Sequence, residues 1–158
     1  MSKAPEVRLL VTNRSGRRPP CTRPGLLALA GEVLAGEKLR GSAEISLLYC
    51  TDEEIRALNK AHRRKDTPTD VLSFPCGERA GGVLLLGDIV ISLATAERQC
   101  ASSRFGLRDE VRLLFCHGLL HLLGHDHRTK AEEAAMVERQ ARYLGVSKEA
   151  AWRHGEAH

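Results

Sequence analysis

Aromatic residues are scarce in this chain, which has 158 residues of which only 4% are Phe, Trp or Tyr. The hydrophobic core must therefore be built mainly from Leu, Val, Ile and Ala. No apolar run approaches the roughly 18 residues that a membrane-spanning helix needs, and the N-terminus lacks the apolar segment of a signal peptide. We therefore expect a soluble, cytoplasmic protein with no membrane partner.

Cysteine pairs are also missing. The five cysteines are an odd number, are widely spaced and include no C-x-x-C motif. This pattern predicts neither a disulfide framework nor a cysteine zinc site, so we expect most of the cysteines to be reduced core residues. Cys116 stands beside His117, but neighbours on a helix point about 100° apart, which makes Cys116 a poor co-ligand for a metal.

The excess of positive charge is small, because Lys plus Arg number 24 against 20 Asp plus Glu. This balance permits a polyanionic partner without requiring one. The length fits one domain, residues 1–158, and the 42% of hydrophobic residues can fill one core of ordinary size. We find no internal repeat, linker or boundary that would indicate a second domain.

Hydrophobic periodicity predicts four strands and about five helices. The strands are expected at residues 7–12, 43–49, 71–75 and 83–92. The helices are expected from residue 24, from residue 52, and at about 92–103, 107–123 and 130–143. The helix at 107–123 is strongly apolar and should be central and buried.

Four details of this pattern can be tested. Pro75 should end the third strand, and Gly87-Asp88 inside the fourth predicts a bulge or a close backbone approach. Met136 should fill the core, and residues 146–158 should form a polar, frayed tail. The last long helix should turn one side to the core, with the residues Ala134, Val137, Ala141 and Leu144.

Histidines are concentrated in one stretch, His117-Gly-Leu-Leu-His121-Leu-Leu-Gly124-His125-Asp-His127, which holds four of the seven in the chain. On a helix, His117 and His121 project from one face one turn apart, close enough to share a cation. Gly124 can leave the helix in a left-handed conformation, so His127 can return as a third ligand. Three neutral imidazoles with an open fourth position are the usual catalytic zinc arrangement, which supplies hydroxide at neutral pH.

Two alternatives remain open for this stretch. A fourth protein ligand, such as Asp126 or a cysteine, would make the zinc purely structural. The spacing also matches the ligands of metzincin proteases, whose general base is a Glu beside the first His. Gly118 occupies that position here and cannot move a proton, so a peptidase is disfavoured.

The most basic segment spans residues 56–65. A solvated helix end would explain it, since cations are favoured there by the helix dipole. However, residues 66–70 have turn chemistry and residues 71–75 form a strand, so these cations stand at the entrance of a strand and can line a cleft. The basic side chains are Arg56, Lys60, His62, Arg63, Arg64 and Lys65.

Four motifs in order resemble those of the YbeY family, metal-dependent endoribonucleases of rRNA maturation. They are Leu58-Asn59 to Arg63, Pro68-Thr-Asp-Val-Leu-Ser-Phe-Pro75, Leu86-Gly-Asp-Ile-Val-Ile91 and the histidine stretch. Two positions depart from the family pattern. His125 replaces a usual Tyr or Phe and would tune the site or serve as a spare ligand, and Arg64 replaces a commonly small residue.

The resemblance implies a single α+β domain with a small mixed four-stranded sheet, and one zinc ion per chain on His117, His121 and His127. It implies an essential catalytic Arg63, cleavage of single-stranded RNA, maturation of the 3′ end of 16S rRNA, and a part in ribosome quality control. The expected partners are rRNA precursor, the ribosome and its assembly proteins, without DNA. We expect RNA contacts from the remaining cations Arg56, Lys60, Arg64 and Lys65.

Two functions from other classes compete with this one. A zinc hydrolase of peptides would need a Glu delivered from elsewhere in the chain. A non-catalytic ribosome assembly factor with a structural metal would keep its ribosome association when the histidines are replaced.

Overall fold

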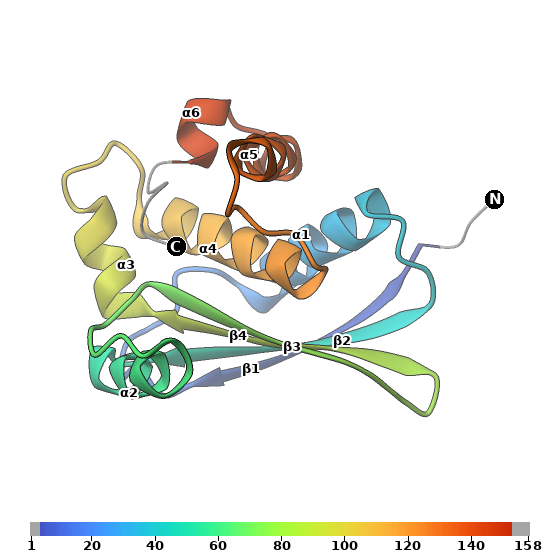
Figure 1. Ribbon diagram of the computed structural model, residues 1–158, viewed down its shortest axis with the longest axis horizontal. Helices are drawn as coiled ribbons and strands as arrows, with labels where there is room; N and C mark the ends of the chain where they lie inside the picture. Colours follow the sequence, from blue (N-terminus) through green and yellow to red (C-terminus); the bar gives the residue numbers. More distant parts are fainter. Residues whose placement is uncertain (1–3, 153–158) are drawn as a thin grey trace.

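The computed structural model describes residues 4–152, which form an α+β domain with one mixed sheet and six helices (Figure 1). The predicted fold class is confirmed. In chain order the elements are β1 (Glu6–Asn13), α1 (Arg23–Gly36), β2 (Ser42–Cys50), α2 (Asp52–Arg63), β3 (Val71–Ala80), β4 (Val83–Ser92), α3 (Leu93–Cys100), α4 (Leu107–Leu122), α5 (Lys130–Leu144) and α6 (Lys148–Ala151). None of the helices within residues 4–152 has the length and apolar character needed to cross a membrane.

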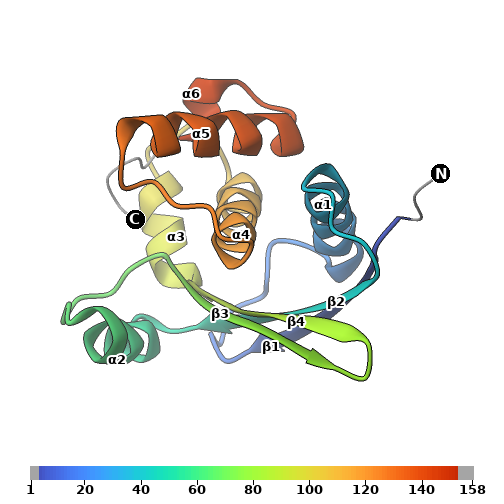
Figure 2. The same ribbon diagram turned by 45° about the vertical axis from the view of Figure 1, so that its right-hand side comes forward.

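The sheet has the strand order β1-β2-β4-β3. β1, β2 and β4 run parallel, and β3 pairs with β4 in the antiparallel direction. α1 and α4 lie side by side over one face of the sheet, and α5 and α6 form a further layer above them (Figure 2). α2 lies on the opposite face, where Ile55 and Leu58 pack with Leu72 and Val90.

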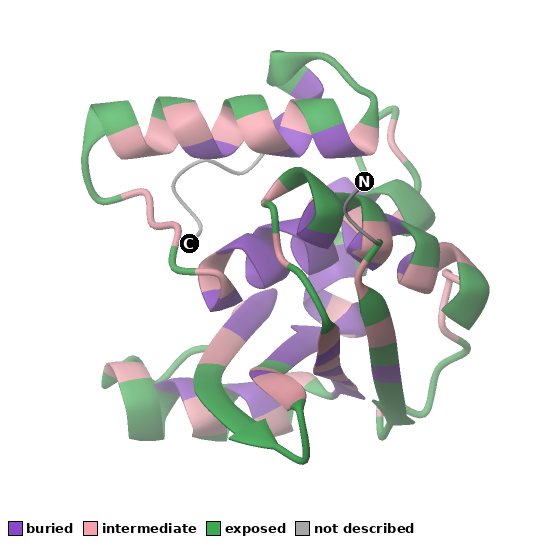
Figure 3. Cartoon of the chain, turned by 90° about the vertical axis from the view of Figure 1, so that its right-hand side faces the viewer, coloured by how far each residue is buried: buried purple, intermediate pink, exposed green. Residues whose placement is uncertain are grey.

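α4 is the central helix of the domain, as its sequence predicts. Its sixteen residues include eleven that are buried, and Figure 3 shows it enclosed between the sheet and α5. A helix that is apolar on nearly every side must be covered from every side, so side chains on α4 are held firmly by their surroundings.

β3 is longer than its sequence predicts. It continues through Pro75 to Ala80, with an irregularity in its pairing to β4 between Pro75 and Glu78. β3 is an edge strand, so the missing N–H of Pro75 costs less than it would in a central strand. The expected close approach at Gly87 is confirmed, because its φ is +133° and a Cβ there would lie 2.2 Å from the carbonyl oxygen of Phe74.

The C-terminal part of the chain corrects two predictions. The buried face of α5 consists of Met136, Gln140 and Tyr143, whereas Ala134 on the predicted face is exposed. The tail is not frayed between residues 147 and 152, because the Ser147 hydroxyl caps α6 and both Ala150 and Ala151 are buried. His154 and His158, also part of the predicted tail, lie outside the described residues.

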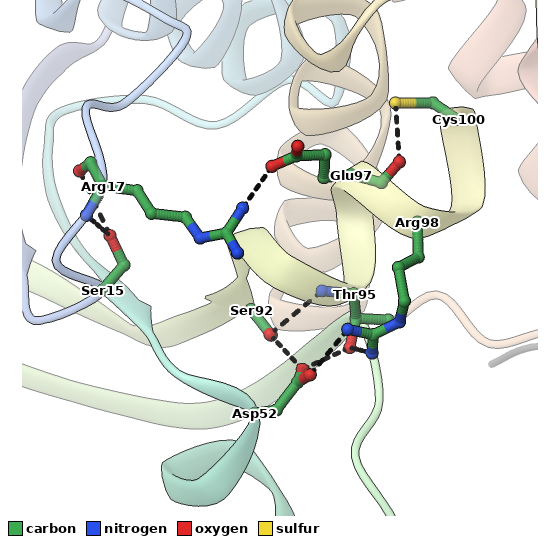
Figure 4. A network of polar contacts seen from close by, with 8 residues as sticks. All are labelled: Ser15, Arg17, Asp52, Ser92, Thr95, Glu97, Arg98 and Cys100. Atoms are coloured by element: carbon green, nitrogen blue, oxygen red, sulfur yellow. Dashed lines mark hydrogen bonds and ion pairs between the residues drawn. The ribbon is translucent and has the colours of Figure 1, made fainter.

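Asp52, the first residue of α2, joins that helix to the start of α3 (Figure 4). Its carboxylate accepts hydrogen bonds from the hydroxyls of Ser92 at 2.7 Å and Thr95 at 2.6 Å, and pairs with Arg98 at 2.8 Å. Burial alone would raise the pKa of Asp52, but the bonds from these three side chains outweigh it and lower that pKa. The network fixes one end of α2 against the sheet.

Replacing Asp52 by Ala should lower the free energy of unfolding at pH 7 by about 1.5–3 kcal/mol, because three hydrogen bonds to a charged group are lost. The pKa is lowered in the folded state, so the stabilisation is complete above the unfolded-chain value of about 4 and is lost as the pH falls further. Urea unfolding at pH 7 and pH 3 measures both effects. Glu53→Ala, an exposed acid in the same helical turn, is the control and should change stability by less than about 0.5 kcal/mol.

Candidate metal centre

The end of α4 reverses the chain toward the histidines that this helix carries. The N–H of Gly124 donates to the carbonyl of His121, and the N–H of His125 donates to the carbonyl of Leu120, both at 3.0 Å. These are the two bonds of a Schellman motif, and Gly124 has the positive φ, +98°, that the motif requires. The predicted left-handed exit at Gly124 is therefore confirmed.

This reversal brings three imidazoles together. His117, His121 and His127 each offer a ring nitrogen, and these atoms lie within 4.8 Å of one another. The Nε2 atoms of His117 and His121 are 3.0 Å apart. In a tetrahedral zinc site, ligand nitrogens about 2.05 Å from the ion lie about 3.4 Å from each other. The three side chains therefore fit a metal ion with small adjustments.

No fourth His, Cys, Asp or Glu side chain within residues 4–152 joins this cluster. The carboxylate of Asp126 accepts the backbone N–H of His127 at 2.8 Å and pairs with Arg128 at 2.9 Å. Cys116 is fully buried, and burial raises the pKa of its thiol to about 12, which disfavours the thiolate that a metal would bind. In the described part of the chain, neither residue completes a closed, structural site.

His125 also stays outside the cluster. Its Nε2 lies 2.5 Å from Oε1 of Glu37, whose other oxygen accepts the hydroxyl of Tyr143. Burial would raise the pKa of Glu37, but the hydrogen bonds from Tyr143 and His125 outweigh it and lower that pKa. The side chain of His125 is outside the three-histidine group and links the end of α4, through Glu37, to α1 and α5.

Gly118 is required by the packing of α4 on the sheet. A Cβ at this position would lie 2.9 Å from Cγ2 of Ile89 and 3.1 Å from the hydroxyl oxygen of Ser73. That hydroxyl donates to the carbonyl of Gly118 at 3.2 Å, which fixes the close contact between α4 and β3. The Glu that serves metzincins as general base has no room here, and this argues against the peptidase alternative.

A cleft of about 430 Å³ opens over the histidines. Arg63 lines it from the last turn of α2, and Asp126 and Arg128 line it from the segment that follows α4. Of the basic residues in the segment 56–65, Arg63 is the one on its wall. The full lining consists of Arg63, Val71, Leu72, Ser73, Pro75, His117, His121, Asp126, His127 and Arg128.

The other expected RNA contacts lie outside the wall of this cleft. Arg56 and Lys60 both pair with Asp66, at 2.8 and 3.9 Å. Arg64 caps α2 in the left-handed conformation with φ +58°, and like Lys65 it is exposed. The turn at Arg64 separates it from Arg63, so these two neighbouring arginines face different surroundings.

Three residues that lie near the histidines were not predicted from the sequence to belong to the site. Gln140 Oε1 lies 2.7 Å from Nδ1 of His117, and the Trp152 ring lies 5.7 Å from the ring of His117 and 5.4 Å from that of His127. Arg128 is the third. Gln140 could have been noticed if the buried face of α5 had been assigned correctly. A polar Gln between Met136 and Tyr143 on that face needs buried hydrogen-bond partners.

Comparison with known proteins agrees with this geometry. The model of the family described as Endoribonuclease YbeY matches residues 24–147. The Endoribonuclease YbeY of Aquifex aeolicus is 48% identical over 103 residues, which cover 65% of this chain and 69% of that protein. The Endoribonuclease YbeY of Anaeromyxobacter dehalogenans is 44% identical over 128 residues, which cover 81% of this chain and 62% of that protein.

A solved structure has the same fold. The solution structure of TM1509 from Thermotoga maritima superimposes with a TM-score of 0.56 and 25% sequence identity, over 94% of each chain. The matched region, residues 24–147, spans the part of this chain that holds the helix with two histidines, the reversal at Gly124 and the third histidine. The chain therefore belongs to the YbeY family of endoribonucleases, hydrolases that cleave RNA at internal bonds.

Proposed function

We propose that this chain is a zinc-dependent endoribonuclease specific for single-stranded RNA. In this proposal it acts in the cytoplasm on the precursor of 16S rRNA, at the 3′ end, and in ribosome quality control, together with the ribosome and its assembly proteins. The observation that carries the proposal is the convergence of three histidines and Arg63 on one cleft. The family of the chain supports cleavage of RNA.

Zinc is the metal that the three imidazoles favour. Catalytic zinc sites commonly have three protein ligands and keep the fourth position for water or substrate. Bound there, zinc would supply a Lewis acid and activate water near neutral pH. His117 is held deepest, at 3% exposure, while His121 and His127 are half-buried and border the cleft. The ligand set thus presents one accessible side.

Arg63 would stabilise the phosphate during cleavage. Attack on a phosphodiester places extra negative charge on the non-bridging oxygens, and a planar guanidinium can donate two parallel hydrogen bonds to them. Arg63 stands on the cleft wall shared with the histidines, and α2, which carries it, is fixed at its other end by Asp52. Arg128 lines the same cleft from another element and would contact a neighbouring phosphate.

The shape of the cleft favours a single strand. A duplex keeps its phosphates on a stiff outer surface, whereas a single strand can bend and present one phosphate to a recessed group. The reactive nitrogens here lie within a cleft of about 430 Å³, next to a nearly buried His117. RNA that is free of pairing is therefore the expected substrate.

An RNA cleavage assay tests the proposal. Precursor RNA containing the 3′ end of 16S rRNA is incubated with zinc-loaded protein, with protein stripped by a chelator, and with His121→Ala. Three other substrates are tested alongside: a duplex of the same RNA sequence, single-stranded DNA of that sequence, and an unstructured peptide. Cleavage of the single-stranded RNA alone, dependent on metal and His121, supports the proposal. Peptide hydrolysis would instead support the peptidase, and ribosome association without any cleavage would support the assembly factor.

RNA binding should weaken steeply with salt. If Arg63, Arg64, Lys65 and Arg128 each contact a phosphate, the logarithm of affinity should fall against the logarithm of salt with a slope of about −2.8. Raising salt from 50 to 200 mM would then weaken binding by roughly 50-fold. Fluorescence anisotropy with chelator-treated protein, which does not cleave, measures this slope. Arg64→Gln should reduce it by about 0.7, and a salt-independent affinity would contradict the phosphate contacts.

A further inference from the structure

His117 is the most enclosed of the three histidines, and one buried amide controls its inner nitrogen. Gln140, 1% exposed, places its Oε1 at 2.7 Å from Nδ1 of His117. Its Nε2 donates to the backbone carbonyl of Ala151 at 2.6 Å. A carbonyl oxygen only accepts, so the nitrogen end of the amide must face Ala151 and the oxygen end must face His117.

This orientation decides where the proton of His117 lies. The amide oxygen can only accept, so Nδ1 must carry the hydrogen that the contact requires. In a neutral imidazole the other nitrogen, Nε2, then has a lone pair. Nε2 is the atom 3.0 Å from Nε2 of His121, on the side where the three rings meet. The hydrogen bonds therefore select the tautomer that can bind a metal through Nε2.

The far end of this chain of bonds lies in α6. Ser147 caps that helix, Ala151 is fully buried, and Trp152 packs its ring beside His117 and His127. The family model matches residues 24–147 and so ends before α6 begins at Lys148. A segment outside the matched region thus contacts two of the three histidines and holds the amide that orients one of them.

We propose that Gln140, anchored on the Ala151 carbonyl of α6, is a positioning residue that holds His117 in the Nδ1–H tautomer before a metal arrives. The inference rests on the three-histidine metal site of the proposed function, and it adds Gln140 and α6 to that site. Hydrogen-bond partners of metal-binding histidines fix ring orientation, and their loss typically lowers metal affinity about 10–100-fold.

Two replacements separate the roles of the amide. Gln140→Leu puts a somewhat shorter, apolar side chain in the place of the amide and removes both hydrogen bonds. Gln140→Glu keeps an oxygen that can accept from Nδ1 of His117 while placing a second acceptor against the Ala151 carbonyl. If tautomer selection is the role, Glu should rescue the state of His117 and Leu should not. Met136→Ala, one turn earlier on the same buried face, is the control for lost packing.

The test combines nuclear magnetic resonance with zinc titration. Long-range proton–nitrogen spectra of metal-free protein near pH 8 report which nitrogen of His117 carries the proton, and competition with a chelator gives zinc affinity. We expect the Nδ1–H pattern in wild type, Gln140→Glu and Met136→Ala, and its loss in Gln140→Leu with zinc affinity lowered about 10–100-fold. An Nδ1–H pattern and wild-type zinc affinity in Gln140→Leu, or a Glu variant as impaired as Leu, would overturn the proposal.

Neither readout uses RNA, so the outcome is independent of whether the protein cleaves the proposed substrate. The spectra of the metal-free protein also test the tautomer if the native metal is not zinc. An inactive protein with the expected spectra would therefore contradict the proposed function and leave the role of Gln140 standing.

Discussion

Replacing His121 by Ala is expected to remove the metal from the protein and to abolish RNA cleavage. Wild-type protein purified gently should contain about one zinc per chain, because three imidazoles converge within 4.8 Å. Removal of one of three direct ligands should weaken binding by more than the roughly 100-fold that loss of an outer hydrogen-bond partner can cost. Elemental analysis by mass spectrometry measures the zinc content, and chelator competition measures the affinity.

His125 and His127 provide a matched pair for this prediction. They are two residues apart, but His127 belongs to the cluster whereas His125 contacts Glu37. His127→Ala should lose zinc as His121→Ala does, and His125→Ala should retain it while losing some stability. A zinc content near zero in the wild type, or one unchanged by His121→Ala, would refute the site.

The cluster of His117, His121 and His127 could be predicted because the information that places these side chains is local. His117 and His121 are one helical turn apart, and Gly124 supplies the one conformation that returns the chain within three residues to His127. Helix geometry and a glycine therefore suffice, without knowledge of the rest of the fold.

Gln140 could not be placed in this way. It lies 23 residues from His117, and the contact depends on how α5 stacks on α4. The predicted core side of α5 was Ala134, Val137, Ala141 and Leu144, but the buried apolar side chains are the larger Met136 and Tyr143, which fill more of the core. The polar Gln140 shares their face because it has two buried partners, His117 and the carbonyl of Ala151.

The predictions for Pro75 and for the C-terminal segment were wrong for a related reason. A proline ends a central strand, but β3 is at the sheet edge, and strand order is a property of the whole chain. The tail from residue 146 was predicted to be polar as a whole, yet Ala150 and Ala151 are buried and Trp152 packs beside the ring of His127. Local pattern predicts elements, whereas their neighbours decide where they end and what they bury.

Arg63→Ala should lower RNA turnover by a factor on the order of a hundred or more while leaving fold and zinc content unchanged. Removing one hydrogen-bond donor that acts mainly on transition-state charge typically lowers turnover by this factor. Such a change lowers kcat more than it raises KM. Arg63 lines the same cleft as the three histidines but does not belong to the group that could hold the metal. Metal binding should therefore not depend on Arg63. Single-turnover cleavage of a short labelled RNA, with zinc content measured on the same sample, tests this.

Arg63→Lys and Arg64→Ala separate charge, geometry and register. Lysine keeps the positive charge but lacks the planar fork that donates two parallel hydrogen bonds, so it should rescue turnover only in part. Arg64→Ala removes an equal charge one residue later, where the left-handed cap of α2 leaves the side chain exposed and off the cleft wall. It should weaken RNA binding and leave turnover at saturating RNA near the wild-type value. If Arg64→Ala instead lost turnover while Arg63→Ala cleaved normally, the catalytic guanidinium would be the one at the helix cap, and the cleft would not be where the phosphate reacts.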